Sequence, residues 1–270
     1  RDSLLAALPE TEANKERLAV GQLIAEQAFT QLNRFCALRM CEERDLILES
    51  VRAGYESVGF QSYDAIAQQT AMPKYNRYKW YLHSIFDELS IELPAVFDRF
   101  SPYGLVFPDE NTLLKLLDLI NDTQLSEWYD EQNGMTVNFW MEDETLGWMF
   151  QDYNSLEERR KMREESNKPR NSREMAVRNQ FFTPEYIVRF LTDNSLGRIW
   201  YEMTKGQSRI GEEKCHYMVR RPDETIEERA IKEPTEILSL DPTCGSMHFG
   251  LYLYEVYEYC LLYTSPSPRD

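Results

Sequence analysis

Apolar residues recur at helical spacing over the first part of the chain, from residue 11 to about residue 50. The side chains of this pattern are Leu18, Leu23, Ile24, Ala28, Phe29, Leu32, Phe35, Cys36 and Leu38. Spacings of three and four residues place them on one side of a helix. The pattern therefore predicts a long helix over residues 11–50. A turn at residues 107–111 precedes a second periodic stretch and predicts a helix from Thr112 to Ile120.

Three charged residues, Arg34, Arg39 and Glu42, lie within the first apolar helix. A charge that is withdrawn from water is costly unless it is paired. We therefore expect a buried helix whose arginines pair with neighbouring acids.

Aromatic residues are concentrated between positions 55 and 100 and include Tyr75, Tyr78, Trp80, Tyr81 and Phe86. Because lysines and an arginine alternate with them, they could form a surface on which nucleobases stack. The other interpretation is packing in a core, which is favoured because the run passes into acidic residues. We expect these rings to be core residues.

A polar and basic stretch, residues 155–178, follows the helical part. Its composition, with Pro169 in the middle, predicts an exposed helix, a break and a connector. Contact with a DNA backbone is the alternative. Beyond the connector, Thr183 is expected to cap a helix whose first position is Pro184, where a missing N–H costs nothing.

A short apolar run, Ile237–Leu240, predicts a buried strand. It ends on Asp241 and Pro242, and proline cannot continue a central strand. Gly245 then precedes a largely apolar run, residues 249–259, which predicts a helix. A strand, a glycine-containing turn and a helix N-terminus offer backbone N–H groups to an anionic group. A carboxylate at the strand end can also accept hydrogen bonds from a ligand.

The 270 residues are 42% hydrophobic and 13% aromatic, which is enough for a sizeable core. The net charge of −16 argues against a surface that grips DNA, because neutralising phosphates requires clustered Lys and Arg. Residues 159–178 carry the one local excess of positive charge. No run of about 18 apolar residues occurs, so no membrane span is expected. The chain starts on Arg1 without a signal-peptide pattern, and we expect it to begin inside a longer protein.

Two short motifs connect the chain to a known family. Residues 241–249, D-P-T-C-G-S-M-H-F, resemble the D-P-x-C-G-S-G-H-F cofactor motif of N6-adenine DNA methyltransferases, which use S-adenosylmethionine. Met247 stands at the second glycine of that motif. Residues 179–184, N-Q-F-F-T-P, resemble the G-x-[FY]-[FY]-T-P motif that precedes it in the same family, with Asn179 at the glycine. Residues 33–42 are similar to an N-R-x-x-A-L-R-x-x-E helix of large, PglX-like phage-defence methyltransferases.

The resemblance implies an adenine-specific DNA methyltransferase of the restriction-modification or phage-defence type, in the cytoplasm. It implies S-adenosylmethionine as the cofactor and double-stranded DNA as a partner, bound mainly through regions beyond this chain. Defence-system proteins are further partners to consider, and no membrane is expected. The residues that the motifs assign to the cofactor are Phe182, Thr183, Pro184, Asp241, Thr243, Cys244, Gly245 and Ser246.

The five cysteines show no C-x-x-C spacing. In a protein with a cytosolic motif they are expected to be reduced thiols rather than a disulfide or zinc framework. No metal site is expected.

The chemistry of this family also needs an [N/D/S]-P-P-[Y/F/W] loop, which supplies acceptors for the adenine amine and an aromatic stacking face. No such loop occurs in the sequence. We therefore assign no catalytic residue and expect the chain by itself to be an inactive fragment, which methyl transfer to DNA by the purified chain would disprove. Two other functions stay open. They are a methyltransferase that uses the same cofactor on another substrate, and a non-catalytic helical interaction module.

The expected fold is mainly α. An N-terminal helical domain over residues 1–154 leads through the connector, residues 155–178, into a truncated α/β Rossmann-like methyltransferase domain over residues 179–259.

The last residues, 260–270, have the sequence C-L-L-Y-T-S-P-S-P-R-D. Pro266 and Pro268 exclude a helix there, and we expect the preceding helix not to continue into this segment. The segment matches one reading frame of a transposase-type sequencing adapter, and we expect it to be an assembly artefact. Long sequencing reads that show these codons in the genome would refute that expectation.

Overall fold

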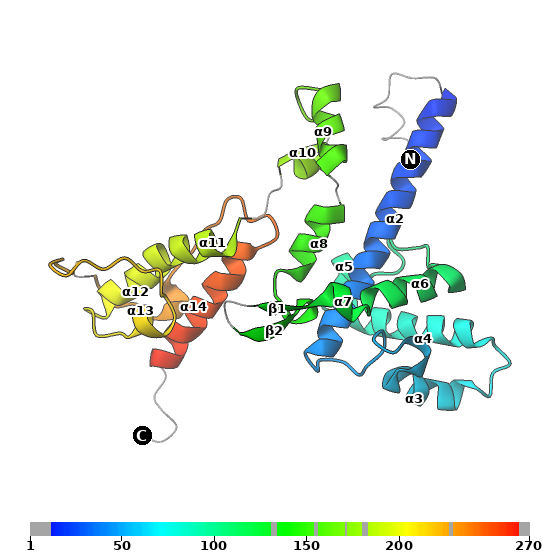
Figure 1. Ribbon diagram of the computed structural model, residues 1–270, viewed down its shortest axis with the longest axis horizontal. Coiled ribbons are helices and arrows are strands. Elements are labelled where there is room, and N and C mark those ends of the chain that lie inside the picture. The colour runs from blue at the N-terminus through cyan, green and yellow to red at the C-terminus, as the bar shows by residue number, and fades with distance from the viewer. Residues whose placement is uncertain are drawn as a thin grey trace. The chain divides into compact units, whose positions relative to one another are not determined.

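The computed structural model describes residues 12–130, 134–153, 156–170, 172–179, 183–226 and 229–264. Helices dominate these residues, and two strands, β1 (Glu127–Asp130) and β2 (Met135–Asn138), form a two-stranded antiparallel sheet (Figure 1). The mainly α fold expected from the sequence is confirmed. The chain divides into two compact units, Arg1–Leu146 and Gly147–Asp270. The finer division expected from composition stays a prediction.

The first unit contains α2 (Glu12–Glu43), the long helix drawn in blue in Figure 1. It confirms the first predicted helix but ends before residue 50, where Asp45 turns the chain with a positive φ of 55°. The other helices are α3 (Val58–Ala67), α4 (Lys74–Leu89), α5 (Pro94–Phe97), α6 (Glu110–Ile120) and α7 (Thr123–Ser126), with 3₁₀ turns at Gly54–Glu56 and Phe139–Met141. The helix predicted from Thr112 is α6, and the Asp109 side chain caps it by accepting the Thr112 N–H at 3.1 Å.

The core of the first unit is aromatic. Its buried rings are Phe35, Phe60, Tyr78, Tyr81, Phe86, Phe97 and Trp140. Phe60 and Tyr78 meet edge to face with centroids 5.0 Å apart, and Phe35 meets Phe86 in the same way at 6.4 Å. The core interpretation is confirmed for Tyr78, Tyr81 and Phe86, whereas Tyr75 is half-buried. Trp80 of α4 is different, because 47% of its surface is exposed.

Arg34 of α2 is buried at 1% exposure and ties a distant loop to the helix. Its guanidinium donates to the carbonyl oxygens of Val96 (2.8 Å), Asp98 (2.8 Å) and Gly104 (3.0 Å). Gly104 leaves the space that the guanidinium needs, since a Cβ there would lie 2.2 Å from Arg34 Nη2. The expectation that Arg34 pairs with an acid is wrong. A planar guanidinium carries five N–H donors, which here satisfy carbonyls of α5 and of the loop that follows it.

The other two charged residues of the motif in α2 also serve the fold. Arg39 forms an ion pair with Glu43, as predicted, and donates to Asn121 Oδ1 at 3.1 Å. Glu42 accepts the backbone N–H groups of residues 50–52 and so holds the chain that leaves α2. Burial raises the pKa of Glu42, although these N–H groups favour its charged form.

The second unit begins within α8 (Thr145–Tyr153). Its other helices are α9 (Leu156–Glu165), α10 (Ser172–Asn179), α11 (Glu185–Thr192), α12 (Arg198–Met203), α13 (Ile210–Glu213) and α14 (His248–Thr264), with a π-helical turn at Asp193–Gly197 and a 3₁₀ turn at Pro234–Glu236. The basic stretch forms α9 and α10, with Pro169 in the break between them. The predicted connector is therefore itself partly helical.

Helices α11, α12 and α14 supply most of the hydrophobic core of the second unit. Its buried residues are Val188, Leu196, Trp200, Met203, Ile210, Cys215, Met218, Tyr252, Val256 and Cys260. Among the described residues of the chain, no helix is long and apolar enough to cross a membrane.

Two expectations for the end of the chain are wrong. Ile237–Leu240 forms no strand, and Leu238 and Leu240 are 92% and 87% exposed. A strand needs a neighbour for its backbone hydrogen bonds, and the described residues of the second unit contain no strand with which it could pair. The predicted helix over residues 249–259 is confirmed as α14, but it continues to Thr264 because Cys260 extends its buried face. The Rossmann-like arrangement stays a prediction, and residues 265–270 lie outside the described part.

Candidate functional site

Asp241 begins the loop that leads into α14. One of its carboxylate oxygens, Oδ1, accepts the Thr243 N–H at 2.9 Å and so fixes the turn after Pro242. The other, Oδ2, is buried and has no hydrogen-bond partner among the described residues. A buried acceptor without a partner is costly, and a bound ligand with a donor group would satisfy it.

A cavity of about 450 Å³ lies beside this carboxylate. Its lining consists of Leu191, Thr192, Ser195, Leu196, Ile199, Ile237, Leu238, Ser239, Leu240, Asp241, Pro242, Thr243, Phe249 and Leu253. The volume suits a small organic ligand, and a mainly apolar wall with a few polar groups is typical of such sites. Because Asp241 is the one ionisable residue in this lining, the cavity suits a ligand with an apolar or planar body and a cationic or hydroxyl donor.

The turn between Asp241 and α14 contains two residues in the left-handed backbone conformation. Gly245 has φ 52° and Met247 has φ 69°. A non-glycine residue rarely adopts this conformation, which costs on the order of 1 kcal/mol. Met247 therefore keeps the backbone conformation that glycine adopts freely, at the position where the resembled motif has glycine. Its side chain is 51% exposed, and its Cε would lie 2.6 Å from a Cβ placed on Gly250.

Three residues of the turn, Cys244, Gly245 and Ser246, lie close to the N-terminus of α14. Cys244 and Gly245 are exposed, whereas Ser246 is partly buried. The Ser246 Oγ atom has no hydrogen-bond partner in the described part of the chain. The first N–H groups of a helix lack partners within it, so this end of α14 favours an anionic or electron-rich group.

The residues of the first motif are placed differently from the prediction. Thr183 does not cap α11: Pro184 is the N-cap residue, with ψ 142°, and its carbonyl accepts the Ile187 N–H at 2.9 Å. The helix therefore starts one residue later than expected, at Glu185. Neither Thr183 nor Pro184 belongs to the lining of the cavity. Phe182 lies outside the described residues, and the role of the first motif in cofactor binding stays a prediction.

The π-helical turn Asp193–Gly197 is a feature of the site that the sequence pattern did not suggest. Asp193 is fully buried and accepts hydrogen bonds from the Tyr252 hydroxyl (2.8 Å) and the Tyr217 N–H (2.9 Å). Burial, followed by the bond to Asp193, raises the pKa of Tyr252. The extra residue in this turn carries Ser195 into the cavity lining, and π turns often occur at functional sites. The sequence signal that could have indicated this turn is the run of Asp193, Asn194 and Ser195 inside an otherwise apolar helical stretch.

The cysteines differ sharply in accessibility. Cys36, Cys215 and Cys260 are buried, and Cys244 is the exposed one of the five. Burial raises the pKa of Cys36 and of Cys260 to about 12, so these thiols stay protonated and unreactive at neutral pH. The motif thus contains the most accessible thiol of the chain.

The sequence was compared with protein families and with curated proteins. No protein-family model matches it. The chain is 23% identical over 275 residues to the adenine-specific methyltransferase PglX of Lacticaseibacillus casei (strain Zhang), a match that covers 88% of this chain and 22% of PglX. It is 33% identical over 125 residues to the adenine-specific methyltransferase BrxX of Escherichia coli O9:H4 (strain HS), covering 43% of this chain and 10% of BrxX.

These matches confirm the resemblance to adenine-specific methyltransferases that the motifs indicate. The chain spans less than a quarter of the length of either of these relatives.

Proposed function

We propose that this chain is part of a longer S-adenosylmethionine-dependent DNA methyltransferase that modifies adenine N6 in restriction-modification or phage defence. The observation that carries the proposal is Asp241, whose buried Oδ2 has no partner and which precedes a left-handed turn into α14. Its motif has the residue order of the methyltransferase cofactor motif. The similarity to two adenine-specific methyltransferases supports the same class.

The residues around the cavity fit this cofactor. Asp241 would accept hydrogen bonds from an ammonium or hydroxyl group, and the Thr243 hydroxyl lies on the same wall. Phe249 and Leu253 would pack against its apolar parts. The loop Cys244–Ser246 would present the N-terminus of α14, and Phe182, Thr183 and Pro184 are proposed to close the site from the first motif. When bound, the cofactor supplies an electrophilic methyl group.

The residues of this chain would bind the cofactor, but they do not supply all the groups that methyl transfer to adenine needs. Adenine N6 in a duplex becomes accessible when the base is flipped out, and its amine then needs polar acceptors. The sequence contains no loop of the required type, so we assign that step to residues outside this chain and propose that the chain alone is inactive. The net charge of −16 is consistent with DNA being held mainly elsewhere, with α9 and α10 as the local basic candidates.

A second candidate function is an interaction module that docks other proteins of a defence system. The acidic excess of the first unit and its exposed apolar residues, such as Ile24 and Leu105, favour it. A methyltransferase that acts on another substrate is a third candidate.

The test uses the full-length protein that contains this chain, incubated with radiolabelled S-adenosylmethionine and duplex DNA. We expect saturable cofactor binding and label on adenine N6. Cofactor binding with label on another acceptor would favour the other substrate class. Absence of cofactor binding would contradict the proposal, and the interaction module would then be the remaining candidate function.

A further inference from the structure

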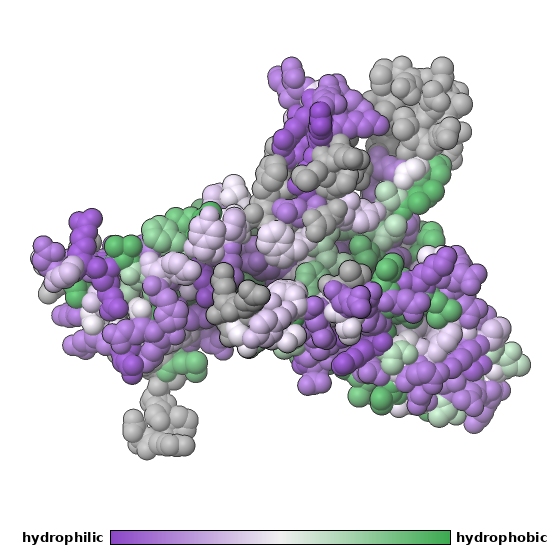
Figure 2. All heavy atoms as spheres, in the orientation of Figure 1, coloured by the Kyte–Doolittle hydropathy of each residue, from purple (hydrophilic) through white to green (hydrophobic). Residues whose placement is uncertain are grey.

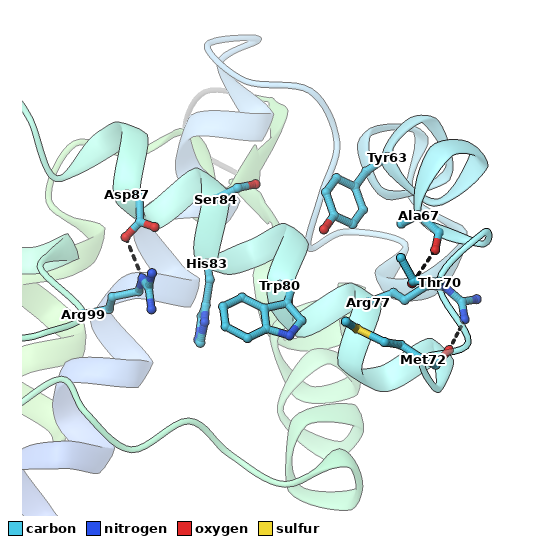
Figure 3. Close-up of a pocket in the computed structure, with 10 residues that line it drawn as sticks. All are labelled: Tyr63, Ala67, Thr70, Met72, Arg77, Trp80, His83, Ser84, Asp87 and Arg99. Atoms are coloured by element: carbon cyan, nitrogen blue, oxygen red, sulfur yellow. Dashed lines mark hydrogen bonds and ion pairs between the residues drawn. The ribbon is translucent and has the colours of Figure 1, made fainter.

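A second cavity lies in the first unit and shares no residue with the cofactor site. It has a volume of about 480 Å³ and lies among α3, α4 and two connecting segments (Figure 3). Its lining consists of Tyr63, Ala67, Thr70, Met72, Arg77, Trp80, His83, Ser84, Asp87 and Arg99. The set combines aromatic rings with two guanidinium groups.

The indole ring of Trp80 lines this cavity. Trp80 is 47% exposed, although Tyr78 and Tyr81 on the same helix are buried in the core. Its ring meets His83 edge to face, with centroids 5.6 Å apart, and His83 meets Phe107 in the same way at 5.0 Å. Figure 3 shows Trp80 and His83 next to each other, with their rings directed into the same space. A braced and half-exposed indole offers a planar ligand a surface on which to stack.

The two arginines have different hydrogen-bonding capacity. Arg77 is engaged by both Asp64 oxygens and by the Met72 carbonyl. Arg99 bonds to Asp87 through Nε at 2.6 Å, and no hydrogen bond from its two terminal amines is recorded in the described part of the chain. These amines can form the paired hydrogen bonds that a phosphate accepts. Arg99 thus keeps N–H donors for an anion, although its charge is already paired with Asp87 of the same lining.

The charges in the lining favour an anion over a cation, because two guanidinium groups, Arg77 and Arg99, accompany one carboxylate, Asp87. Burial, followed by the positive charges of Arg99 and Lys79, lowers the pKa of His83 to about 4, and Asp87 opposes this effect. His83 is consequently neutral at physiological pH. The rings alone would suit a quaternary ammonium group, but the two guanidinium groups make the cavity a poor match for one.

We propose that this cavity binds a free mononucleotide, with its base stacked on Trp80 and its phosphate on Arg99. Thr70 and Ser84 also belong to the lining. Their hydroxyl groups donate to the carbonyls of Ala67 and Tyr81 at 2.6 Å each, so their oxygen atoms keep only acceptor capacity toward the polar edge of a base. The volume suits one nucleotide. A nucleic-acid strand is the poorer match, because residues 1–158 carry a large acidic excess that repels a polyanion.

The test is a calorimetric titration of the 270-residue chain with adenosine 5′-monophosphate, adenosine and inorganic phosphate as separate probes. We expect saturable binding of the monophosphate. Trp80→Leu should weaken it by about ten-fold or more, since stacking on an aromatic ring is worth ~1–3 kcal/mol per base. Arg99→Gln should weaken the monophosphate but leave adenosine unaffected, which assigns the phosphate contact.

Two matched variants separate this site from other sites. Trp128→Leu removes an indole of similar exposure, 46%, from β1 of the same unit and should leave the affinity unchanged. Asp241→Asn should also leave it unchanged, which distinguishes this cavity from the proposed cofactor site. Far-UV circular dichroism identifies any variant that fails to fold. Three results would overturn the proposal. They are an absence of saturable binding of the monophosphate, an affinity of the folded Trp80→Leu variant equal to that of the unmodified chain, and binding of oligonucleotides without binding of the monophosphate.

Discussion

Replacing Asp241 by Asn is expected to weaken S-adenosylmethionine binding to the full-length protein by about ten- to a hundred-fold. The change keeps the shape of the side chain and removes its charge. A hydrogen bond to a charged group contributes ~1.5–3 kcal/mol, and every 1.4 kcal/mol is about ten-fold in affinity. The buried Oδ2 atom has no other recorded partner in the described residues, so most of its binding capacity is available to the ligand. Equilibrium dialysis with labelled cofactor measures the effect.

The matched control is Glu258→Gln, which neutralises an exposed carboxylate on α14. This variant should bind the cofactor like the unmodified protein. Equal losses in both variants would indicate a general effect of charge on the unit. An unchanged affinity in folded Asp241→Asn would remove the assignment of Asp241 to the cofactor.

Replacing Arg34 by Met is expected to destabilise the first unit by ~1–3 kcal/mol or more, because a buried carbonyl that loses its hydrogen-bond donor typically costs this much. The methionine fills part of the volume but leaves the carbonyls of Val96, Asp98 and Gly104 without their donor. Arg34→Lys should recover little, because an ammonium lacks the planar fork that reaches three acceptors. Urea unfolding followed by circular dichroism measures the free energy of unfolding.

Arg52 provides the comparison for this experiment. Its side chain is exposed, and Arg52→Met should change the free energy of unfolding by no more than about 0.5 kcal/mol. If Arg34→Met costs less than about 1 kcal/mol, the hydrogen bonds of Arg34 to the loop do not support the fold in the way described.

Local signals in the sequence were sufficient for two helices of the first unit. The apolar spacing predicted α2 and α6, although α6 begins at Glu110, two residues before the predicted start at Thr112. The partners of Arg34 could not be predicted from such signals. They lie more than 60 residues away in sequence, in the short helix α5 and the loop that follows it.

The strand predicted at Ile237–Leu240 failed for a different reason. An apolar run indicates burial, but a strand also requires a neighbour that no local pattern can supply. The motif that follows was more informative, because the left-handed conformation of Met247 matches the glycine expected at that position. The cavity around Trp80 could not be foreseen, since Trp80 and Arg99 come from segments that only the tertiary fold brings together.

Alkylation of Cys244 tests the location of the cofactor site most directly. Cys244 lies in the proposed site and is the exposed cysteine, so a maleimide should modify it before Cys36, Cys215 and Cys260. In the full-length protein, saturating S-adenosylhomocysteine is expected to slow its modification at least several-fold, as followed by peptide mass spectrometry. An unchanged rate at Cys244, while calorimetry shows the ligand to be bound, would place the cofactor elsewhere and contradict the account.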